Sequence, residues 1–300
     1  MKKLLLITVL ICTSLMCSCQ TDDVFEEIQI TQDNIQESDK IGLKIEKYMD
    51  QNSSGVSVQG AASYGDYLFQ FQDHNEAIYI YNLAEKRFVQ KVNLTPNSNN
   101  HCNQVSFTNI FYEENDKLPL LYVSGSRTET YNHIQVYRIT EEDGYFEIVQ
   151  IQEIILPQKN EDNWVSWTCS ILDNDNLFLY AYASNASTRL IKFEIPDYHI
   201  ETVTLTDQDI LEFIPIEHID HQQGGIIRDG IFYMIFGVPG WGDTVWLRLY
   251  NLETRTEIVR YNLSEMKFKG EPEGLFFYKN ELYCVTNNAG IYKIIFRKGT

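Results

Sequence analysis

From residue 57 onward, apolar and polar residues alternate in short runs that are separated by turn sequences. The turn sequence YGD at residues 64–66 precedes one such run at 67–71, and RDG at 228–230 precedes another at 231–236. A turn followed by alternation with period two is typical of a β-hairpin. The pattern predicts a domain of short antiparallel strands, and the 19 Tyr and 16 Phe residues favour strands over a helical bundle.

Two stretches of the chain repeat each other. Residues 78–94 and 247–263 have the same length, and in both of them Tyr-Asn-Leu near the start is followed by Asn-Leu at the end. Weaker copies fill the remainder and define five units of roughly fifty residues, a period typical of propeller blades. The units begin near Gln59, Gln104, Trp164, Gln223 and Glu273.

The last unit supplies three strands before the C-terminus, whereas a propeller blade has four. Residues 41–48 alternate with period two ahead of the first unit, and pairing them with the last unit removes an exposed sheet edge. We therefore expect an all-β fold, a five-bladed β-propeller closed by an N-terminal strand. Six blades remain an alternative if residues 141–163 or 206–220 contain a further unit. A β-sandwich explains the alternation but not the repeat.

The N-terminus resembles a lipoprotein signal peptide. Two lysines precede an apolar stretch at residues 4–16, which is too short to cross a bilayer as a permanent helix. The sequence MCSC at 16–19 resembles a bacterial lipobox with Cys19 as the acylated residue, because Ser18 before it is small. Cys17 is the competing acceptor, but it places the bulky Met16 at the cleavage site. Acyl chains such as palmitate on Cys19 give stable membrane anchoring; a soluble secreted protein is the alternative.

We expect three parts in the chain: a signal peptide at 1–18, an acidic tether at 19–40 and the propeller at 41–300. Between residues 20 and 39 there are seven acidic residues and no Lys or Arg, a composition that favours a solvated segment. Acidic residues directly behind the acylated cysteine resemble the surface-export signal of Bacteroidetes lipoproteins. That resemblance implies display on the outside of the outer membrane, with periplasmic retention as the alternative.

The whole chain is acidic, with 42 Asp and Glu against 24 Lys and Arg and a formal net charge of −18. A field of this sign repels phosphate backbones, so nucleic acid is not expected as a partner, and membrane contact is expected through the lipid anchor only. The propeller's cysteines, Cys102, Cys169 and Cys284, are widely spaced among apolar residues. We expect buried free thiols rather than disulfides.

Polar and aromatic residues recur at the head of the predicted innermost strand of each unit. In a propeller these positions surround the central axis, so we expect them to form a ligand-binding ring. Amides, carboxylates, imidazoles and an indole together are typical of sites for sugars and similar polyhydroxylated ligands. The alternative is that these groups only hydrogen-bond each other in a crowded channel. The candidate residues are Gln59, His101, Asn103, Gln104, Trp164, His221, Gln223, Glu271 and Glu273, with Asp73, Trp241 and Asn287 at the expected rim.

The sequence contains few features that indicate catalysis. The chain has no G-x-S-x-G, H-E-x-x-H or P-loop motif. Glu273 with His101 or His221 is the acid/base pair that a glycan hydrolase or lyase would need. No cofactor or metal centre is expected, because His218 and His221 lack a third ligand; an axial calcium bound by Glu271 and Glu273 is the remaining cation candidate.

The five units, the glutamines near the axis and the closing sequence EPEGLFF at 271–277, followed by ELY at 281–283, are similar to a loose group of five-bladed propellers. That group includes the helveticin-like and teichoic-acid-biosynthesis C-type proteins, and the similarity spans residues 58–296. The resemblance implies a surface that faces glycans. Together these features predict a lipid-anchored outer-membrane propeller that binds an extracellular carbohydrate or cell-surface glycopolymer. A scaffold for protein partners is the remaining alternative, and the oligomeric state is open.

Overall fold

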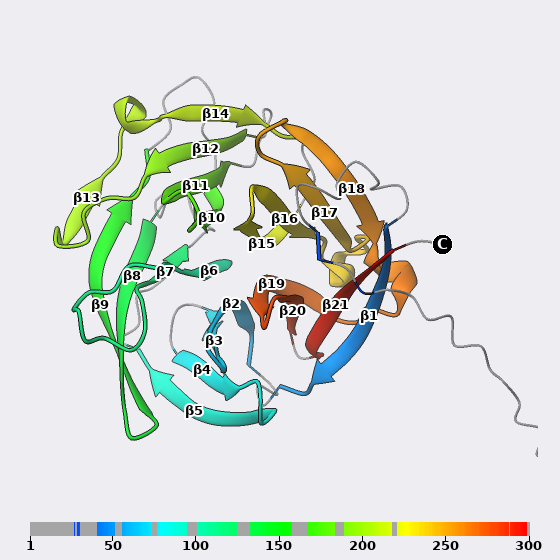
Figure 1. The fold of residues 1–300 in the computed structure, drawn as a ribbon, viewed down its shortest axis with the longest axis horizontal. Coiled ribbons are helices and arrows are strands. Elements are labelled where there is room, and N and C mark those ends of the chain that lie inside the picture. Colours follow the sequence, from blue (N-terminus) through cyan, green and yellow to red (C-terminus); the bar gives the residue numbers. More distant parts are fainter. Residues whose placement is uncertain are drawn as a thin grey trace, which may run out of the picture.

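A computed structural model of the chain shows five small sheets arranged as blades around a central axis, so the predicted five-bladed β-propeller is confirmed (Figure 1). The structure describes residues 27, 29–30, 41–51, 56–73, 77–94, 101–124, 133–157, 167–183, 189–217, 221–287 and 289–298; the side chains of 167–170, 181–183 and 189 lie outside the description.

The blades follow one another in chain order, and each begins with its innermost strand. Blade 1 contains β2 (Val58–Tyr64), β3 (Tyr67–Gln72), β4 (Ala77–Asn82) and β5 (Arg87–Asn93). Blade 2 contains β6 (Gln104–Phe107), β7 (Leu121–Ser124), β8 (His133–Glu142), β9 (Tyr145–Ile155) and β13 (Thr202–Thr204). Blade 3 contains β10 (Trp167–Asp173), β11 (Phe178–Ala183), β12 (Arg189–Glu194) and β14 (Glu212–Pro215). Blade 4 contains β15 (Gln222–Arg228), β16 (Ile231–Phe236), β17 (Trp246–Asn251) and β18 (Thr256–Asn262). Blade 5 contains β19 (Glu271–Tyr278), β20 (Glu281–Asn287), β21 (Gly290–Lys298) and β1 (Ile41–Met49). Short 3-10 turns are η3 (Asp207–Asp209), η4 (Pro239–Trp241) and η5 (Leu263–Met266).

The N-terminal strand closes the ring as predicted. β1 pairs antiparallel with β21, which places Ile45 opposite Ile294. Two tyrosines tie this outer strand to neighbouring blades: the hydroxyl of Tyr48 donates to the carbonyl of Leu83 at 2.7 Å, and that of Tyr261 donates to the carbonyl of Ile41 at 3.0 Å. The last blade therefore contains strands from both ends of the propeller, and β1 covers the edge that β21 would otherwise expose.

The described parts of the two stretches in which a sixth blade was possible, 141–157 and 206–217, belong to blades 2 and 3. Strands β8 and β9 form one long hairpin with its turn at Asp143 and Gly144, both in the left-handed region. Residues 212–215 form β14, the outer strand of blade 3. The three-residue strand β13 was not predicted; it leaves blade 3 and pairs parallel with β9 of blade 2.

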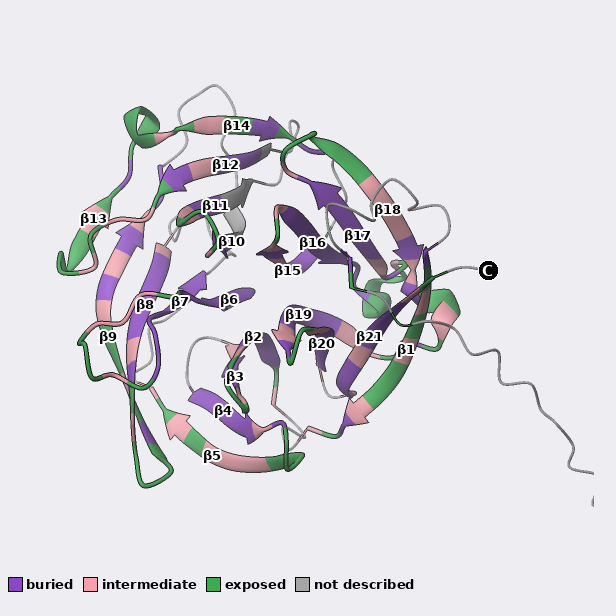
Figure 2. Ribbon diagram, in the orientation of Figure 1, coloured by how far each residue is buried: buried purple, intermediate pink, exposed green. Residues whose placement is uncertain are grey.

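The inner strands of the blades are mostly buried, whereas the outer strands carry many exposed residues (Figure 2). One cluster joins Phe69 and Phe71 of blade 1 to Val123 and Ile139 of blade 2. The ring of Phe69 also contacts the ring of Phe107 edge-on, with centroids 5.3 Å apart. Edge-to-face packing of this kind explains the abundance of Phe and Tyr in the repeats.

Part of the predicted tether packs against the propeller. Ile30 is only 5% exposed and joins the apolar cluster between blades 4 and 5, and Glu27 forms an isolated antiparallel bridge with Arg297. The prediction that residues 19–40 are wholly solvated is wrong at Ile30, because an apolar side chain inside an acidic segment finds an apolar gap to fill. The domain boundaries themselves remain a prediction.

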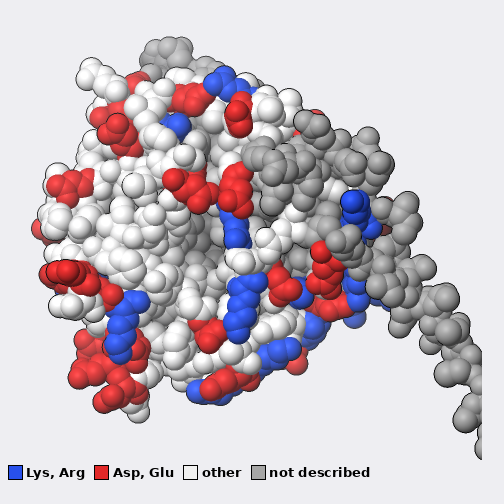
Figure 3. All heavy atoms as spheres, in the orientation of Figure 1, with Lys and Arg blue, Asp and Glu red and all other residues white. Residues whose placement is uncertain are grey.

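Acidic side chains are spread over much of the face shown in Figure 3, as the net charge of −18 requires. Within the described part of the chain, no helix has the length and apolar character needed to cross a membrane.

The five innermost strands approach each other closely at the axis, and glycines make this possible. A Cβ atom at Gly60 would lie 2.6 Å from the carbonyl oxygen of Cys102, and one at Gly224 would lie 3.0 Å from Cα of Gly274. Both neighbours are backbone atoms, which cannot turn aside. The axis is therefore packed rather than open at this level.

Gly60→Ala should lower the free energy of unfolding by about 1–3 kcal/mol, the usual effect of inserting a methyl group into a packed core. Thermal unfolding would show a midpoint several degrees lower. Gly240→Ala is the matched control, because a Cβ atom there has nothing within 4 Å. Equal midpoints for the two variants would contradict a crowded axis.

Candidate functional site

The candidate residues that the structure describes lie at one end of the ring, because every innermost strand begins there. We call this end the start face and the opposite end the far face. Strand β15 leaves the start face and β16 returns to it in the antiparallel direction, so residues 237–245 after β16 also lie on the start face. The turns between first and second strands, such as residues 229–230, lie on the far face.

The amides nearest the axis are buried and bonded to the blades. Gln104 is 1% exposed; its Nε2 donates to Val105 O at 3.0 Å and to Ser106 Oγ at 3.1 Å. Its Oε1 accepts a hydrogen bond of 2.8 Å from the backbone N–H of Gly225. Gln104 thus links blade 2 to blade 4 across the axis and fills the space that the glycines leave.

Gln59, Asn103 and Glu273 are buried as well, and Glu273 is only 1% exposed. Within the described part of the chain, Oε1 of Gln59 has no hydrogen-bond partner. Burial and then the carboxylate of Glu273 raise the pKa of the Cys284 thiol well above its usual value. Cys102 and Cys284 are buried free thiols, as predicted.

Two polar pairs lie at the start face between neighbouring blades. Gln223 of blade 4 donates through Nε2 to Oε1 of Glu271 of blade 5 at 2.9 Å. His101, ahead of blade 2, forms a 2.6 Å hydrogen bond through Nδ1 with Oδ1 of Asp73, which follows β3 of blade 1. The structure therefore brings these candidates together in pairs that bridge blades.

His221 belongs to a third, more exposed group. Its Nδ1 lies 2.6 Å from Oδ2 of Asp243, and the same oxygen accepts a hydrogen bond of 2.9 Å from the backbone N–H of Val238. The ring of Trp241 meets the imidazole edge-on, with centroids 4.9 Å apart, and 71% of Trp241 is exposed. The N–H of Val238, and then His221, hold the pKa of Asp243 below its usual value.

The local sequence explains this geometry. His221 adopts a left-handed backbone conformation with φ of 54°, and its carbonyl accepts a hydrogen bond of 2.9 Å from Gly237 N. Pro239 starts the 3-10 turn η4, and Gly242 ends it in the left-handed region with φ of 92°. The turn directs Trp241 into solvent and returns the chain so that Asp243 reaches His221. Sequence reasoning did not identify Asp243 as a site residue, because nothing local marks it as the partner of a histidine 22 positions earlier.

Several expected residues lie outside the described part of the chain. These are Cys19, Trp164 and His218. Among the residues that are described, no three His, Cys, Asp or Glu side chains are grouped so that they could hold a metal ion. The ligand-binding roles of the remaining candidates stay a prediction.

Asp243→Asn should destabilise the protein near neutral pH, and the difference from the wild type should shrink in acid. Because the folded protein lowers the pKa of Asp243 below its ordinary 3.8, the ionised carboxylate contributes stability above that pH. The contribution is lost as the pH falls through the lower, folded value. Thermal midpoints measured from about pH 6 to pH 3 should therefore converge. Asp143→Asn, at the tip of the β8–β9 hairpin, is the control, and a constant difference for Asp243→Asn would refute the coupling.

Comparisons with known proteins show the fold. No family model matches the chain, and no curated protein matches it. The structure is similar to the crystal structure of glutaminyl cyclase from Myxococcus xanthus, with a TM-score of 0.52 and 9% identity over 85% of this chain and 96% of that one. It also matches a structural genomics protein of unknown function from Bacteroides thetaiotaomicron, with a TM-score of 0.45 and 11% identity over 86% and 76% of the two chains. A third match, Kuenenia stuttgartiensis hydrazine synthase, has a TM-score of 0.41 and 12% identity over 76% and 61%. At such low identity the likeness to the cyclase shows the propeller fold alone.

Proposed function

We propose that this protein is a lipid-anchored propeller of the cell envelope that binds an extracellular carbohydrate on its start face. The observation that carries the proposal is Trp241, a large aromatic side chain that is 71% exposed yet held by η4 against His221. Indole has an apolar face and a polar N–H, and this combination suits a ligand that is apolar on its ring faces and polar at its edges. Sugars have that character.

Other polar groups on the start face suit the same ligand. The imidazole of His221 is oriented by Asp243, and Glu271 with Gln223 lies at the start face of the adjoining blades. Groups that are already held by hydrogen bonds lose little conformational freedom when a ligand binds. The start face therefore offers an exposed aromatic ring beside a pre-oriented imidazole, and a second pre-oriented polar pair on blades 4 and 5.

The catalytic alternative has less support. Glu273, the expected acid or base, is 1% exposed, so a substrate would have to displace packed backbone to reach it. His101 and His221 are each paired with an aspartate, in different blades. We therefore propose binding through the exposed start-face groups and assign no catalytic role to Glu273.

The anchor is proposed from the sequence. The short apolar stretch, the lipobox-like MCSC at 16–19 and the acidic residues behind Cys19 support an acylated protein on the outer membrane, displayed to the exterior. A surface location would expose the start face to polysaccharides outside the cell.

Trp241→Ala should weaken carbohydrate binding at least tenfold, a loss of about 1.4 kcal/mol or more of binding free energy. A tryptophan that a bound ligand covers commonly contributes a large share of that free energy. A glycan array would identify a bound polysaccharide, and calorimetry would compare the variants. Tyr145→Ala is the matched control, since Tyr145 is 73% exposed at the far end of a different blade. No binding to any polysaccharide, or equal affinity for Trp241→Ala and wild type, would refute the proposal.

Cys19→Ala should abolish incorporation of a clickable palmitate analogue into the protein and release it from membranes. Cys17→Ala should be labelled as efficiently as the wild type, because Cys17 is expected to leave with the signal peptide. In-gel fluorescence after metabolic labelling measures both. Labelling that survives in Cys19→Ala but is lost in Cys17→Ala would move the anchor to the competing cysteine.

A further inference from the structure

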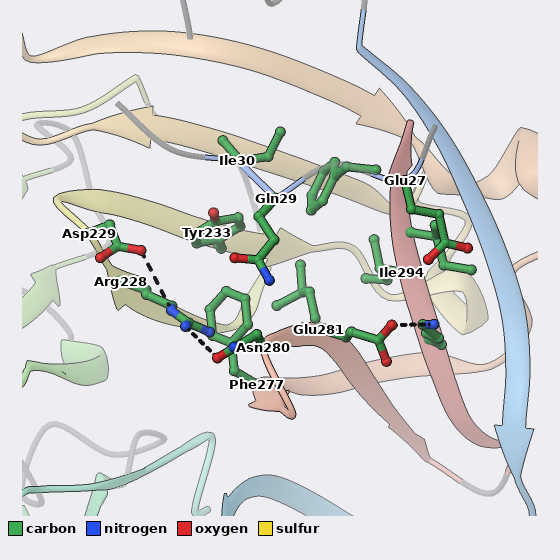
Figure 4. Close-up of a pocket in the computed structure, with 14 residues that line it drawn as sticks. Glu27, Gln29, Ile30, Arg228, Asp229, Tyr233, Phe277, Asn280, Glu281 and Ile294 are labelled. Carbon is green, nitrogen blue, oxygen red and sulfur yellow. Dashed lines mark hydrogen bonds and ion pairs between the residues drawn. The ribbon is translucent and has the colours of Figure 1, made fainter. Parts of the chain in front are cut away.

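The described N-terminal residues occupy a defined place on the propeller. We call Glu27, Gln29 and Ile30 the N-terminal strap. They border a cavity of about 170 Å³ between blades 4 and 5, and Figure 4 shows the side chain of Gln29 directed from the strap toward Asn280 and Phe277. The strap is therefore part of the wall of a groove between two blades.

Apolar packing and backbone pairing both hold the strap. Ile30 is 5% exposed and lies in the same apolar cluster as Tyr233, Leu282 and Phe296. Glu27 bridges Arg297, at the end of β21 that extends beyond the residues paired with β20. The strap thus covers a section of β21 that its own blade leaves unpaired on that side.

The strap lies on the far face. The cavity it borders is lined by Arg228 and Asp229, where β15 turns into β16, and by Asn280 and Glu281, where β19 turns into β20. Both turns connect first and second strands and so lie opposite the start face. Trp241, in the loop after β16, lies at the other end of the same blade.

The chain between the anchor and the strap is short. Cys19 and Glu27 are eight residues apart in the sequence, which allows a span of about 28 Å at full extension. Innermost strands of seven residues, such as β15, make the ring roughly 23 Å deep. To place the start face against the bilayer, the segment from Glu27 to Cys19 would have to run from the far face along the whole side of the ring. That path would take up nearly all of the segment's length.

We infer that the N-terminal strap docks the far face of the propeller toward its lipid anchor and so directs the start face, with Trp241, away from the membrane. The orientation rests on the proposed acylation of Cys19, whereas the docking of the strap does not. The groove between blades 4 and 5 is therefore occupied by the N-terminal strap of the same chain.

Docking is tested with Ile30→Asp in the acylated protein in detergent. A charge in the apolar groove should release the strap, lower the thermal midpoint by roughly 3–8 °C and speed hydrogen exchange in residues 294–297. Ile200→Asp is the matched control, since Ile200 is 50% exposed on the far face, and its midpoint should be unchanged. Equal midpoints and equal exchange for the two variants would overturn the docking.

Orientation is tested by energy transfer from a fluorophore on the protein to a rhodamine lipid in phosphatidylcholine vesicles. Gly240→Cys places the fluorophore on the start face, where a Cβ atom has nothing within 4 Å, and Glu253→Cys places it on the exposed turn after β17 on the far face. Cys102 and Cys284 are buried, and Cys169→Ser is added to both variants to remove the third thiol.

Transfer should be at least twofold more efficient from Glu253→Cys than from Gly240→Cys, and Ile30→Asp should reduce that difference. Equal transfer from the two faces in the protein with Ile30 intact would overturn the orientation. Protein that fails to bind vesicles would overturn the anchor, and the orientation with it, while the thermal and exchange measurements would still decide whether the strap docks.

Discussion

The close approach of five innermost strands at one axis determines what the rest of the molecule is able to do. Backbone meets backbone there, at Gly224 and Gly274, and the remaining space holds the side chain of Gln104 with its bond to Gly225. A buried amide must find partners inside the protein, so the polar groups nearest the axis serve the packing between blades. Groups that remain accessible to a ligand lie farther out, on loops such as η4.

The way the ring is closed also determines where the N-terminal residues lie. Without β1 the last blade would expose the edge of β21, and β1 covers that edge by pairing with β21. The segment ahead of β1 therefore begins beside blades 4 and 5, where Ile30 finds an apolar gap and Glu27 meets Arg297. With the proposed acylation of Cys19, the way the ring is closed and the packing of the strap together determine how the ring is oriented on the membrane.

The sequence predicts the blades well because their strands alternate with period two and repeat, and the need to cover a sheet edge predicts the role of residues 41–48. It does not predict β13, because three residues are too few to show alternation and their parallel pairing with β9 depends on where two blades meet. The partners of the histidines are hidden for a similar reason. Asp73 and Asp243 reach His101 and His221 only after loops distant in sequence fold together. Ile30 could have been noticed in the sequence as an apolar residue in an acidic segment. The prediction of a solvated segment relied on the composition of the whole segment instead.

Charge narrows the kind of carbohydrate that the start face suits. This chain has a net charge of −18, and the polar groups described at its start face include the carboxylates of Asp73, Asp243 and Glu271. Such a surface repels a polyanion over distances up to about the Debye length, about 8 Å at physiological ionic strength. Stacking on Trp241 and hydrogen bonds to carboxylates and amides need no negative charge on the ligand, and hydroxyl groups are good donors to carboxylate oxygens. For the proposed carbohydrate ligand, this arrangement favours a neutral polysaccharide over an anionic one.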